Sequence, residues 1–153
     1  MSHWLLKTEP GEFSIADLEA RGREPWTGVR NHQARNYLRA MRLGDRVLIY
    51  HSSCAVPAVT GIGEVCREAY PDPTQFDPES PYFDPRSDPA RPRWSAVDIA
   101  FGRRLARAVP LAELRTHPAL AQGFALTRRG NRLSVMPVTA AQWAAILSLE
   151  HGP

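Results

Sequence analysis

Cysteine and long hydrophobic runs are both scarce in this sequence of 153 residues. No stretch approaches the roughly 20 apolar residues that a helix needs to cross a bilayer, and no basic leader precedes an apolar run at the N-terminus. The two cysteines, Cys54 and Cys66, lack C-x-x-C spacing, which favours reduced thiols in a reducing compartment over a disulfide framework. These absences predict a soluble, cytoplasmic protein with no membrane partner.

Lysine is almost missing, because Lys7 is the sole lysine among 19 basic residues. The planar fork of arginine binds phosphate oxygens in pairs and stacks on bases, so this bias favours a nucleic-acid partner. A GC-rich genome that encodes arginine in place of lysine explains the bias equally well. The formal net charge is +3, but residues 64–88 hold seven acids against two arginines, so this segment carries −5 and the remainder +8.

Hydrophobic periodicity predicts strands and helices in irregular alternation. A strand is expected over 3–8, and a short helix begins at the capping sequence Ser14-Ile15-Ala16-Asp17 and ends near Gly22. The further expected elements are a helix over 31–41, strands over 46–50, 59–67 and 93–101 (the last continuing to about Leu105), a helix over 111–115, a strand over 133–138 and a final helix with a capping box at Thr139. This order, without repeats, indicates one α+β domain over residues 1–153: a strongly bent mixed sheet or small barrel with peripheral helices.

Two segments interrupt the regular patterns. Gly61 and Gly63 leave one strand face without side chains, which a packed helix or, less often, a ligand must approach closely. Seven prolines from Pro71 to Pro92 predict a long, stiff, acidic loop, and loops of this length are usually lids or binding loops when they are ordered. Aromatic residues in the loop and just before it predict that the loop packs onto the domain; these are Tyr70, Phe76, Tyr82 and Phe83.

The segment from Trp26 to Ser53 combines an aromatic residue, a basic helix and a polar strand end. Asn31 opens the helix, and three arginines at i, i+4 and i+7 are expected to share one face that can meet phosphates; these are Arg35, Arg39 and Arg42. The next strand ends in His51-Ser52-Ser53, whose side chains both donate and accept hydrogen bonds. A flat aromatic ring beside mixed donors and acceptors suits a planar heterocycle.

Each of these residues also has an ordinary structural interpretation. A lone tryptophan is most often part of a core, Asn31 can serve as a helix cap alone, and a strand-end histidine is usually a satisfied structural group. His51 and its two neighbouring serines form no G-x-S-x-G elbow, and no paired spacing joins His51 to the cysteines in a zinc site. Serine-hydrolase, thiol-enzyme and zinc-site interpretations are therefore minor alternatives.

Six blocks of the sequence, taken in order, resemble the EVE domain family, a group of small proteins of the PUA superfamily. The blocks are W-L-L-K-T-E-P (4–10), W-T-G-V-R-N-H-Q-A-R-N (26–36), G-D-R-V-L-I-Y-H-S (44–52), G-I-G-E-V (61–65), Y-P-D-P-T (70–74) and R-L-S-V-M-P-V (132–138). They run nearly end to end, so the resemblance implies that residues 1–153 form one PUA-like domain. The family is similar to YTH domains, which hold a methylated adenine in an aromatic cage, and this kinship implies a pocket for a flipped, modified base.

The resemblance also implies site residues, with Trp26 as the stacking plane. The other residues expected to bind the base are Lys7, Thr8, Glu9, Val29, Asn31, His51, Ser52, Tyr70, Arg132 and Ser134, and those expected to contact phosphates are Arg30, Arg35, Arg39 and Arg42. Two positions depart from the pattern of the family: His3 stands where relatives often have tyrosine, and Met136 where they often have glutamine. Both are expected at the cavity rim, where they would change its polarity.

The leading hypothesis is a non-catalytic reader of a modified nucleobase, such as methylated or hydroxymethylated cytosine, in DNA or RNA. The protein is expected to need no cofactor and no metal. The alternatives are an enzyme or enzyme subunit that acts on modified nucleotides, and a protein-interaction module with a vestigial cavity. The sequence leaves the oligomeric state open, and we expect a monomer.

Overall fold

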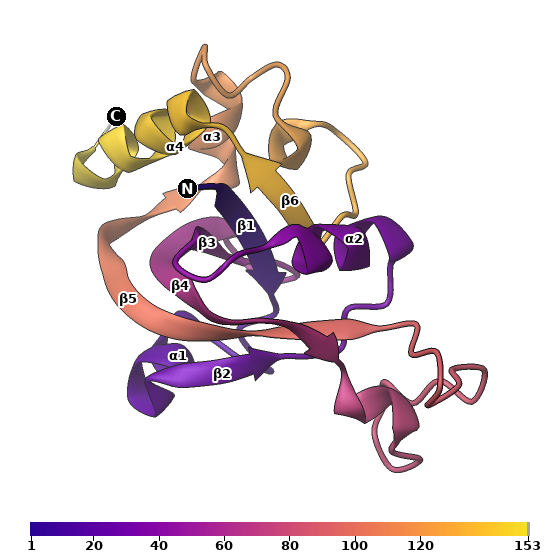
Figure 1. Cartoon of the computed structure of the whole chain (residues 1–153). Coiled ribbons are helices and arrows are strands. Elements are labelled where there is room, and N and C mark those ends of the chain that lie inside the picture. The colour runs from indigo at the N-terminus through magenta and orange to yellow at the C-terminus, as the bar shows by residue number, and fades with distance from the viewer. Residues whose placement is uncertain (153) are drawn as a thin grey trace.

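The strands form one mixed sheet in a computed structural model that describes residues 1–152. They are β1 (His3–Thr8), β2 (Arg23–Trp26), β3 (Arg46–His51), β4 (Ala58–Pro71), β5 (Ser95–Pro110) and β6 (Val135–Val138), arranged in the order β2-β5-β4-β3-β1-β6. Strand β1 runs parallel to β3, and the other neighbouring pairs are antiparallel. The predicted mixed α+β fold is confirmed, with a strongly curved, open sheet in place of a closed barrel (Figure 1).

Four α-helices and three short 3₁₀ turns surround the sheet. They are α1 (Ile15–Arg21), α2 (His32–Ala40), α3 (Leu111–Thr116) and α4 (Ala140–Ser148), with η1 (Pro73–Phe76), η2 (Ala125–Thr127) and η3 (Leu149–His151). Both predicted capping boxes are present, Ser14 with Asp17 on α1 and Thr139 with Gln142 on α4. Within residues 1–152, no helix has the length and apolar character needed to span a membrane.

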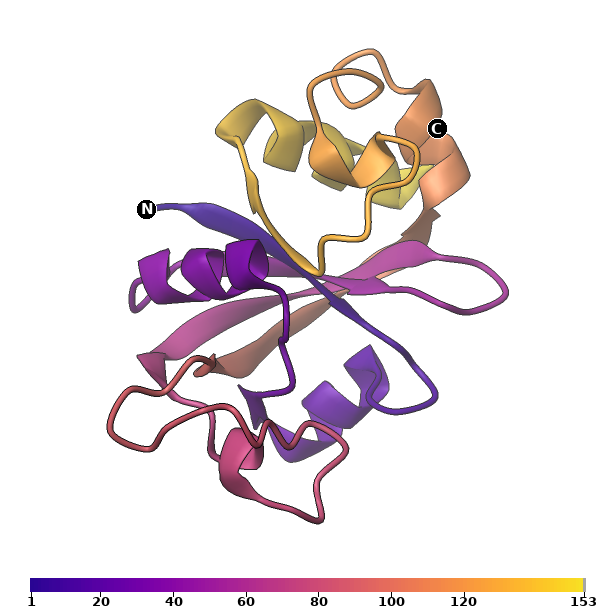
Figure 2. The same cartoon turned by 90° about the vertical axis from the view of Figure 1, so that its right-hand side faces the viewer.

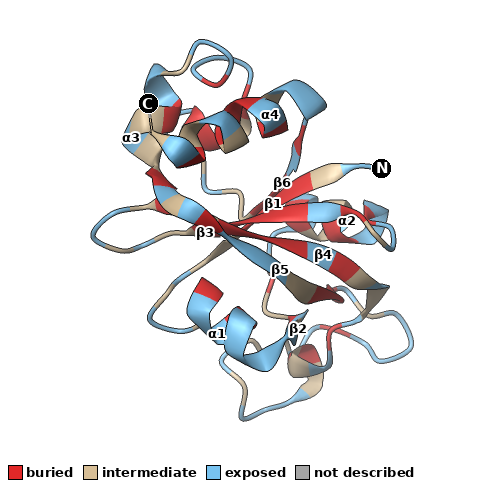
Figure 3. Cartoon of the chain, turned by 90° about the vertical axis from the view of Figure 1, so that its left-hand side faces the viewer, coloured by how far each residue is buried: buried red, intermediate tan, exposed pale blue. Residues whose placement is uncertain are grey.

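The sheet separates two hydrophobic cores because side chains alternate between its faces. Leu5 and Leu48 point into a core shared with α3 and α4, whereas Leu6 and Ile49 point into a second core shared with α1 and α2. The central strands are therefore buried on both faces, as their near-continuous apolar sequence requires, while outer helix faces are exposed (Figure 3). The second core contains Trp26, so this core positions the cleft described below.

Gly61 and Gly63 of β4 leave space in which side chains of neighbouring elements pack against the strand. A Cβ atom on Gly61 would lie 2.5 Å from the Cδ1 atom of Ile15 on α1, and one on Gly63 would lie 2.6 Å from the Cγ2 atom of Ile99. The bare strand face therefore accommodates a helix and a neighbouring strand, which confirms the commoner of the two interpretations.

The proline-rich loop is anchored mainly by buried polar groups. The side-chain amide of Gln75 donates to the carbonyls of Asp72 and Trp94 at 2.7 and 2.9 Å, and its oxygen accepts from the Ser87 hydroxyl and the Trp94 N–H. This buried amide is fully satisfied, so it fixes the loop's path. The predicted aromatic packing is wrong for Phe83, which is 39% exposed.

Two predicted element boundaries and one missed strand bear on the site. Helix α2 ends at Ala40, so Arg42 lies beyond it and shares no helix face with Arg35 and Arg39. Strand β2 was not predicted, because R-E-P-W lacks an alternating pattern, and it forms through antiparallel pairing with β5. Strand β6 begins at Val135, which leaves Ser134 just before the strand.

Candidate nucleic-acid interface

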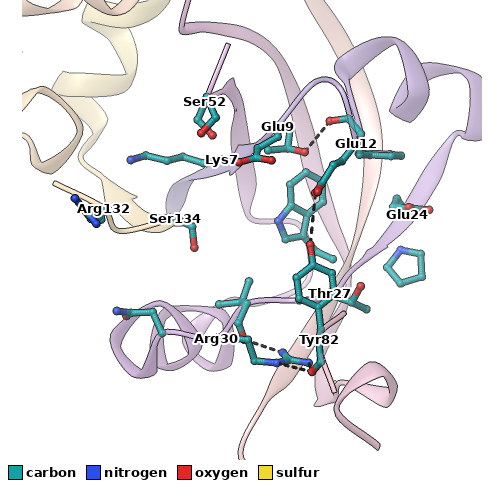
Figure 4. Close-up of a pocket in the computed structure, with 18 of the residues that line it drawn as sticks. Lys7, Glu9, Glu12, Glu24, Thr27, Arg30, Ser52, Tyr82, Arg132 and Ser134 are labelled. Carbon is teal, nitrogen blue, oxygen red and sulfur yellow. Dashed lines mark hydrogen bonds between the residues drawn. The ribbon is translucent and has the colours of Figure 1, made fainter. Parts of the chain in front are cut away.

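A cleft of about 890 Å³ opens where four segments of the chain converge. These segments are the end of β1 with the turn after it, the end of β2 with the 27–31 connection, the polar end of β3, and residues 131–134 before β6; Tyr82 of the proline-rich loop completes the wall. Figure 2 shows this side of the molecule, and Figure 4 shows the cleft at close range.

Trp26 lines this cleft but exposes only 7% of its surface. As the last residue of β2 it pairs with Val97, and its indole meets the Phe13 ring edge-on at 5.9 Å between centroids. Trp26 therefore belongs to the second core and offers the cleft only part of its ring. The aromatic surface available to a ligand is smaller than a fully exposed tryptophan would provide.

Asn31 lines the cleft and also caps helix α2. Its side-chain oxygen accepts the Ala34 N–H at 2.9 Å, which uses one lone pair and leaves the amide nitrogen free to donate. Val29 is buried beside Trp26 and lines the cleft wall between Trp26 and Asn31.

Hydroxyl and ammonium groups come from the adjacent ends of β1 and β3. The Ser52 N–H donates to the Thr8 carbonyl, and the Lys7 N–H donates to the Ser134 carbonyl, each at 2.9 Å. These bonds bring the four predicted residues to one wall of the cleft. Burial lowers the pKa of the Lys7 ammonium from its usual value.

Glutamates line the other part of the cleft. Glu24 is held by Arg21 at 2.8 Å, but Glu9 has no ion pair or side-chain hydrogen bond with any residue among 1–152, and Glu12 accepts only a long 3.5 Å bond from the Tyr82 hydroxyl. The cleft has Lys7 and Arg132 toward one edge and Glu12 and Glu24 toward the other, with Glu9 between them (Figure 4).

Two predicted binding residues lie outside the cleft lining. The Nε2 atom of His51 accepts the Ile15 N–H at 3.1 Å, at the start of α1, and burial lowers the pKa of its imidazole. The Tyr70 hydroxyl donates to Asp98, and the Arg67 guanidinium lies 3.7 Å from the centre of its ring. Burial and then the bond to Asp98 raise the pKa of Tyr70. Both side chains are committed to structural contacts, so the predicted placement of His51 and Tyr70 in the pocket is wrong.

The four arginines predicted to contact phosphates all make contacts within the protein. Arg30 donates to Asp72 at 3.0 Å, to the Thr74 hydroxyl and to the Tyr82 carbonyl. The two arginines of α2, Arg35 and Arg39, donate to the Arg93 carbonyl, and Arg39 also donates to the Ser95 hydroxyl. These three side chains fasten the proline-rich loop to the domain. The Nη1 atom of Arg42 lies 3.8 Å from the Oε1 atom of Glu68, a residue of β4.

Tyr82 is a cleft residue that the sequence patterns did not identify. Its ring packs on Gly28, where an added Cβ atom would lie 2.9 Å from ring carbons, and Gly28 has a φ of +84°. The Gly28 N–H donates to the fully buried Asp72 carboxylate at 2.8 Å, so the loop and the 27–31 connection hold each other. No local pattern could have shown this contact, because 54 residues separate Gly28 from Tyr82.

The two positions that depart from the family's pattern lie away from the cleft. The His3 ring lies against Trp143 at 4.5 Å between centroids, and Met136 is fully buried in the first core. Both were expected at the cavity rim, and that expectation is wrong. They therefore leave the polarity of this cleft unchanged.

Sequence comparison identifies the family. The EVE domain pattern matches residues 2–149. The chain belongs to the EVE domain family. It is 44% identical to human thymocyte nuclear protein 1 over 98% of this chain and 74% of that protein.

Solved structures of similar proteins have the same fold. A Pseudomonas syringae protein is 50% identical, with a TM-score of 0.94, over 97% of this chain and 99% of that one. Human THYN1, solved in complex with DNA that contains 5-methylcytosine, is 42% identical, with a TM-score of 0.91, over 100% of this chain and 99% of that one. The PUA-like fold implied by the sequence is thereby confirmed.

The EVE cleft of this chain has the groups that a heterocycle needs but no evident metal site. Among residues 1–152, no three His, Cys, Asp or Glu side chains gather where they could hold a metal ion.

Proposed function

We propose that this EVE domain is a non-catalytic reader of a modified nucleobase, with methylated or hydroxymethylated cytosine in DNA as the first candidate and RNA as a second possible carrier. The observation that carries the proposal is the cleft beside Trp26, which joins aromatic rings, an amide donor and unpaired carboxylates. The 42% identical human protein was solved with 5-methylcytosine-containing DNA, which supports the same ligand class here.

The unpaired carboxylates favour a base with an exocyclic amino group. A carboxylate accepts hydrogen bonds from such a group, and the N4 amino group of cytosine is a donor that Glu and Asp recognise. Glu9 and Glu12 are available for this contact, whereas Glu24 is already bound by Arg21. Asn31 can donate to the carbonyl side of the same ring.

The energetics require more than one aromatic contact. A base that leaves a duplex loses a few kcal/mol of stacking and pairing, and one aromatic stack returns about 1–3 kcal/mol. Because Trp26 exposes only 7% of its surface, Tyr82 must share the aromatic contact. A snug contact with one methyl group discriminates by only about 1–3 kcal/mol, so we expect a preference for the modified base and not absolute selectivity.

The test is a titration of short DNA duplexes that differ only in one 5-methylcytosine. Wild type should bind the modified duplex more tightly, and Trp26→Ala should remove most of that preference while the circular dichroism spectrum stays native. Trp143→Phe, which alters a tryptophan outside the cleft, is the matched control and should keep the preference. Equal affinity of wild type for both duplexes would overturn the proposal, and chemical conversion of the modified base would indicate an enzyme.

A further inference from the structure

Three arginines beside the cleft have no partner in the rest of the described chain. Arg128, Arg129 and Arg132 are exposed, and their guanidinium groups make no hydrogen bond or ion pair with any residue among 1–152. Most arginines elsewhere are paired with acids or carbonyl groups. Three arginines whose charge is free to meet an external anion thus lie within the five residues 128–132, which we term the arginine turn.

The arginine turn is a built structure and not a loose charged tail. The Asn131 side chain donates to the Ala125 carbonyl at 2.7 Å and accepts the Leu133 N–H at 3.0 Å. Gly130, with a φ of +76°, allows the chain to reverse, and the Asn131 N–H donates to the Arg128 carbonyl. These bonds hold the backbone, so the three guanidinium groups project from a fixed support.

The arginine turn lies between two clefts. Arg132 and Asn131 line the cleft beside Trp26, whereas Arg128 lines a second cleft of about 320 Å³ with Tyr37 of helix α2. Lys7 is close by, because its N–H donates to the carbonyl of Ser134, two residues after Arg132. A nucleic-acid strand bound across both clefts would therefore pass the arginine turn.

We propose that the arginine turn is the phosphate-binding site of this protein, with Arg132 and Lys7 nearest the inserted nucleotide and Arg128 and Arg129 on the adjoining phosphates. This inference rests on the proposed function. It moves phosphate contact from Arg30, Arg35, Arg39 and Arg42 to residues 128–132, and it assigns Arg132 to a phosphate in place of the base. Guanidinium forks bind phosphate oxygens in pairs. The polarity of the cleft orients the nucleotide, with its sugar-phosphate toward the cations and its base toward Glu9 and Glu12.

Phosphate binding has a measurable signature that base recognition lacks. Each neutralised phosphate releases condensed counterions, so the steepness of log affinity against log salt decreases by about 0.9 for each duplex phosphate that a variant no longer neutralises. Phosphate groups carry no sequence information directly, so removing the arginines that bind them should weaken the affinity for modified and unmodified DNA by the same factor.

The test compares three triple variants on duplexes with and without one 5-methylcytosine, over a series of salt concentrations. Arg128→Gln, Arg129→Gln and Arg132→Gln together should lower the salt slope by about 2–3 and leave the ratio between the two duplexes unchanged. The three lysine substitutions at the same positions should restore most of the slope. The matched control, Arg46→Gln with Arg86→Gln and Arg91→Gln, removes the same charge from exposed arginines that line neither cleft and should change the slope by less than about 1.

The outcomes separate this inference from the proposed function. If wild type prefers the modified duplex but the arginine-turn variant keeps the wild-type slope, the phosphate site is overturned while the reader function stands. An equal decrease of slope in the control variant shows a general charge effect and overturns the site as well. If wild type binds neither duplex, both the function and the site are wrong.

Discussion

At the scale of single residues, the cleft holds two carboxylates, Glu9 and Glu12, that have no cation partner within residues 1–152, and the proposed function assigns them the choice of base. Thymine is the informative competitor of 5-methylcytosine, because both carry the methyl group and they differ at position 4, where thymine has an acceptor oxygen in place of the amino donor. Glu9 and Glu12 can accept from the amino group and would repel the oxygen.

We therefore expect wild type to bind 5-methylcytosine in single-stranded DNA about 10-fold or more tightly than thymine at the same position, since one good polar contact is worth about 1–3 kcal/mol. Glu9→Gln and Glu12→Gln should each narrow this ratio, because an amide can donate to the thymine oxygen. Glu24→Gln is the control, since Arg21 already binds that carboxylate. Fluorescence polarisation measures the ratio, and an unchanged ratio in both variants would show that neither glutamate reads the base.

His51 shows why residue roles are harder to predict than residue positions. The sequence placed it at a polar strand end, which is correct, but side chains of successive residues alternate across a strand. Ser52 therefore reaches the cleft while His51 turns to the N-terminus of α1. Which of two adjacent polar residues faces a ligand depends on the strand register and on the position of the neighbouring helix. The local sequence determines neither of them.

At the scale of elements, local patterns predicted a helix start where a capping box fixes it and a strand where apolar and polar residues alternate. Ser14 and Thr139 begin helices as expected, and β1 has the predicted bounds. Strand β2 and the position of Tyr82 escaped prediction because they depend on partners far along the chain, β5 for the strand and Gly28 for the tyrosine. The resemblance to EVE domains supplied the cleft residues of β1 and residue 134, which no periodicity would have joined.

The docking of the proline-rich loop onto the cleft makes a prediction about Gly28. In Gly28→Ala, the new methyl group brings the left-handed backbone cost of about 1–2 kcal/mol and also collides with the Tyr82 ring, which adds about 1–3 kcal/mol of overpacking. Gly123→Ala is the matched control, because Gly123 has a φ of +75° with nothing within 4 Å of an added Cβ atom. Urea unfolding should therefore show a larger loss of stability for Gly28→Ala.

The same substitution in a Tyr82→Ala background isolates the contact. With the ring removed, Gly28→Ala should cost no more than Gly123→Ala, since only the backbone cost remains. If the excess cost persists without the ring, Tyr82 is not the group that Gly28 accommodates.

At the scale of the whole molecule, charge is sorted between two regions. Most acids of residues 64–88 make hydrogen bonds or ion pairs within the domain, as Asp72 does with Arg30 and the Gly28 N–H. The guanidinium groups of the arginine turn make no such contact within residues 1–152. The net charge of +3 is therefore distributed unevenly over the chain. A composition rich in arginine indicated a nucleic-acid partner, but only the folded chain shows which arginines are available.

The stability of the fold at acid pH depends in part on an ion pair between η3, the last described turn, and strand β5. Glu150 of η3 is 5% exposed and accepts two bonds from Arg103 of β5, at 2.7 and 2.8 Å, and one from the Ala106 N–H. The bonds from Arg103 lower the pKa of Glu150 from 4.5 to about 2. Because the folded-state pKa lies below the unfolded value, this contribution is present above pH 4.5 and disappears as the pH falls toward 2.

Glu150→Gln should therefore lower the free energy of unfolding at pH 7 by about 1–2 kcal/mol, less than the full shift implies because the half-exposed Arg103 is screened by solvent. Near pH 2 the variant and wild type should converge, since protonation removes the same charge from wild type. Glu19→Gln, in an exposed pair with Arg104, is the control and should change stability by less than about 1 kcal/mol at either pH. Urea unfolding at both pH values measures these differences, and a Glu150→Gln deficit that is equal at pH 7 and pH 2 would show that the ion pair does not couple the C-terminal turn to the sheet.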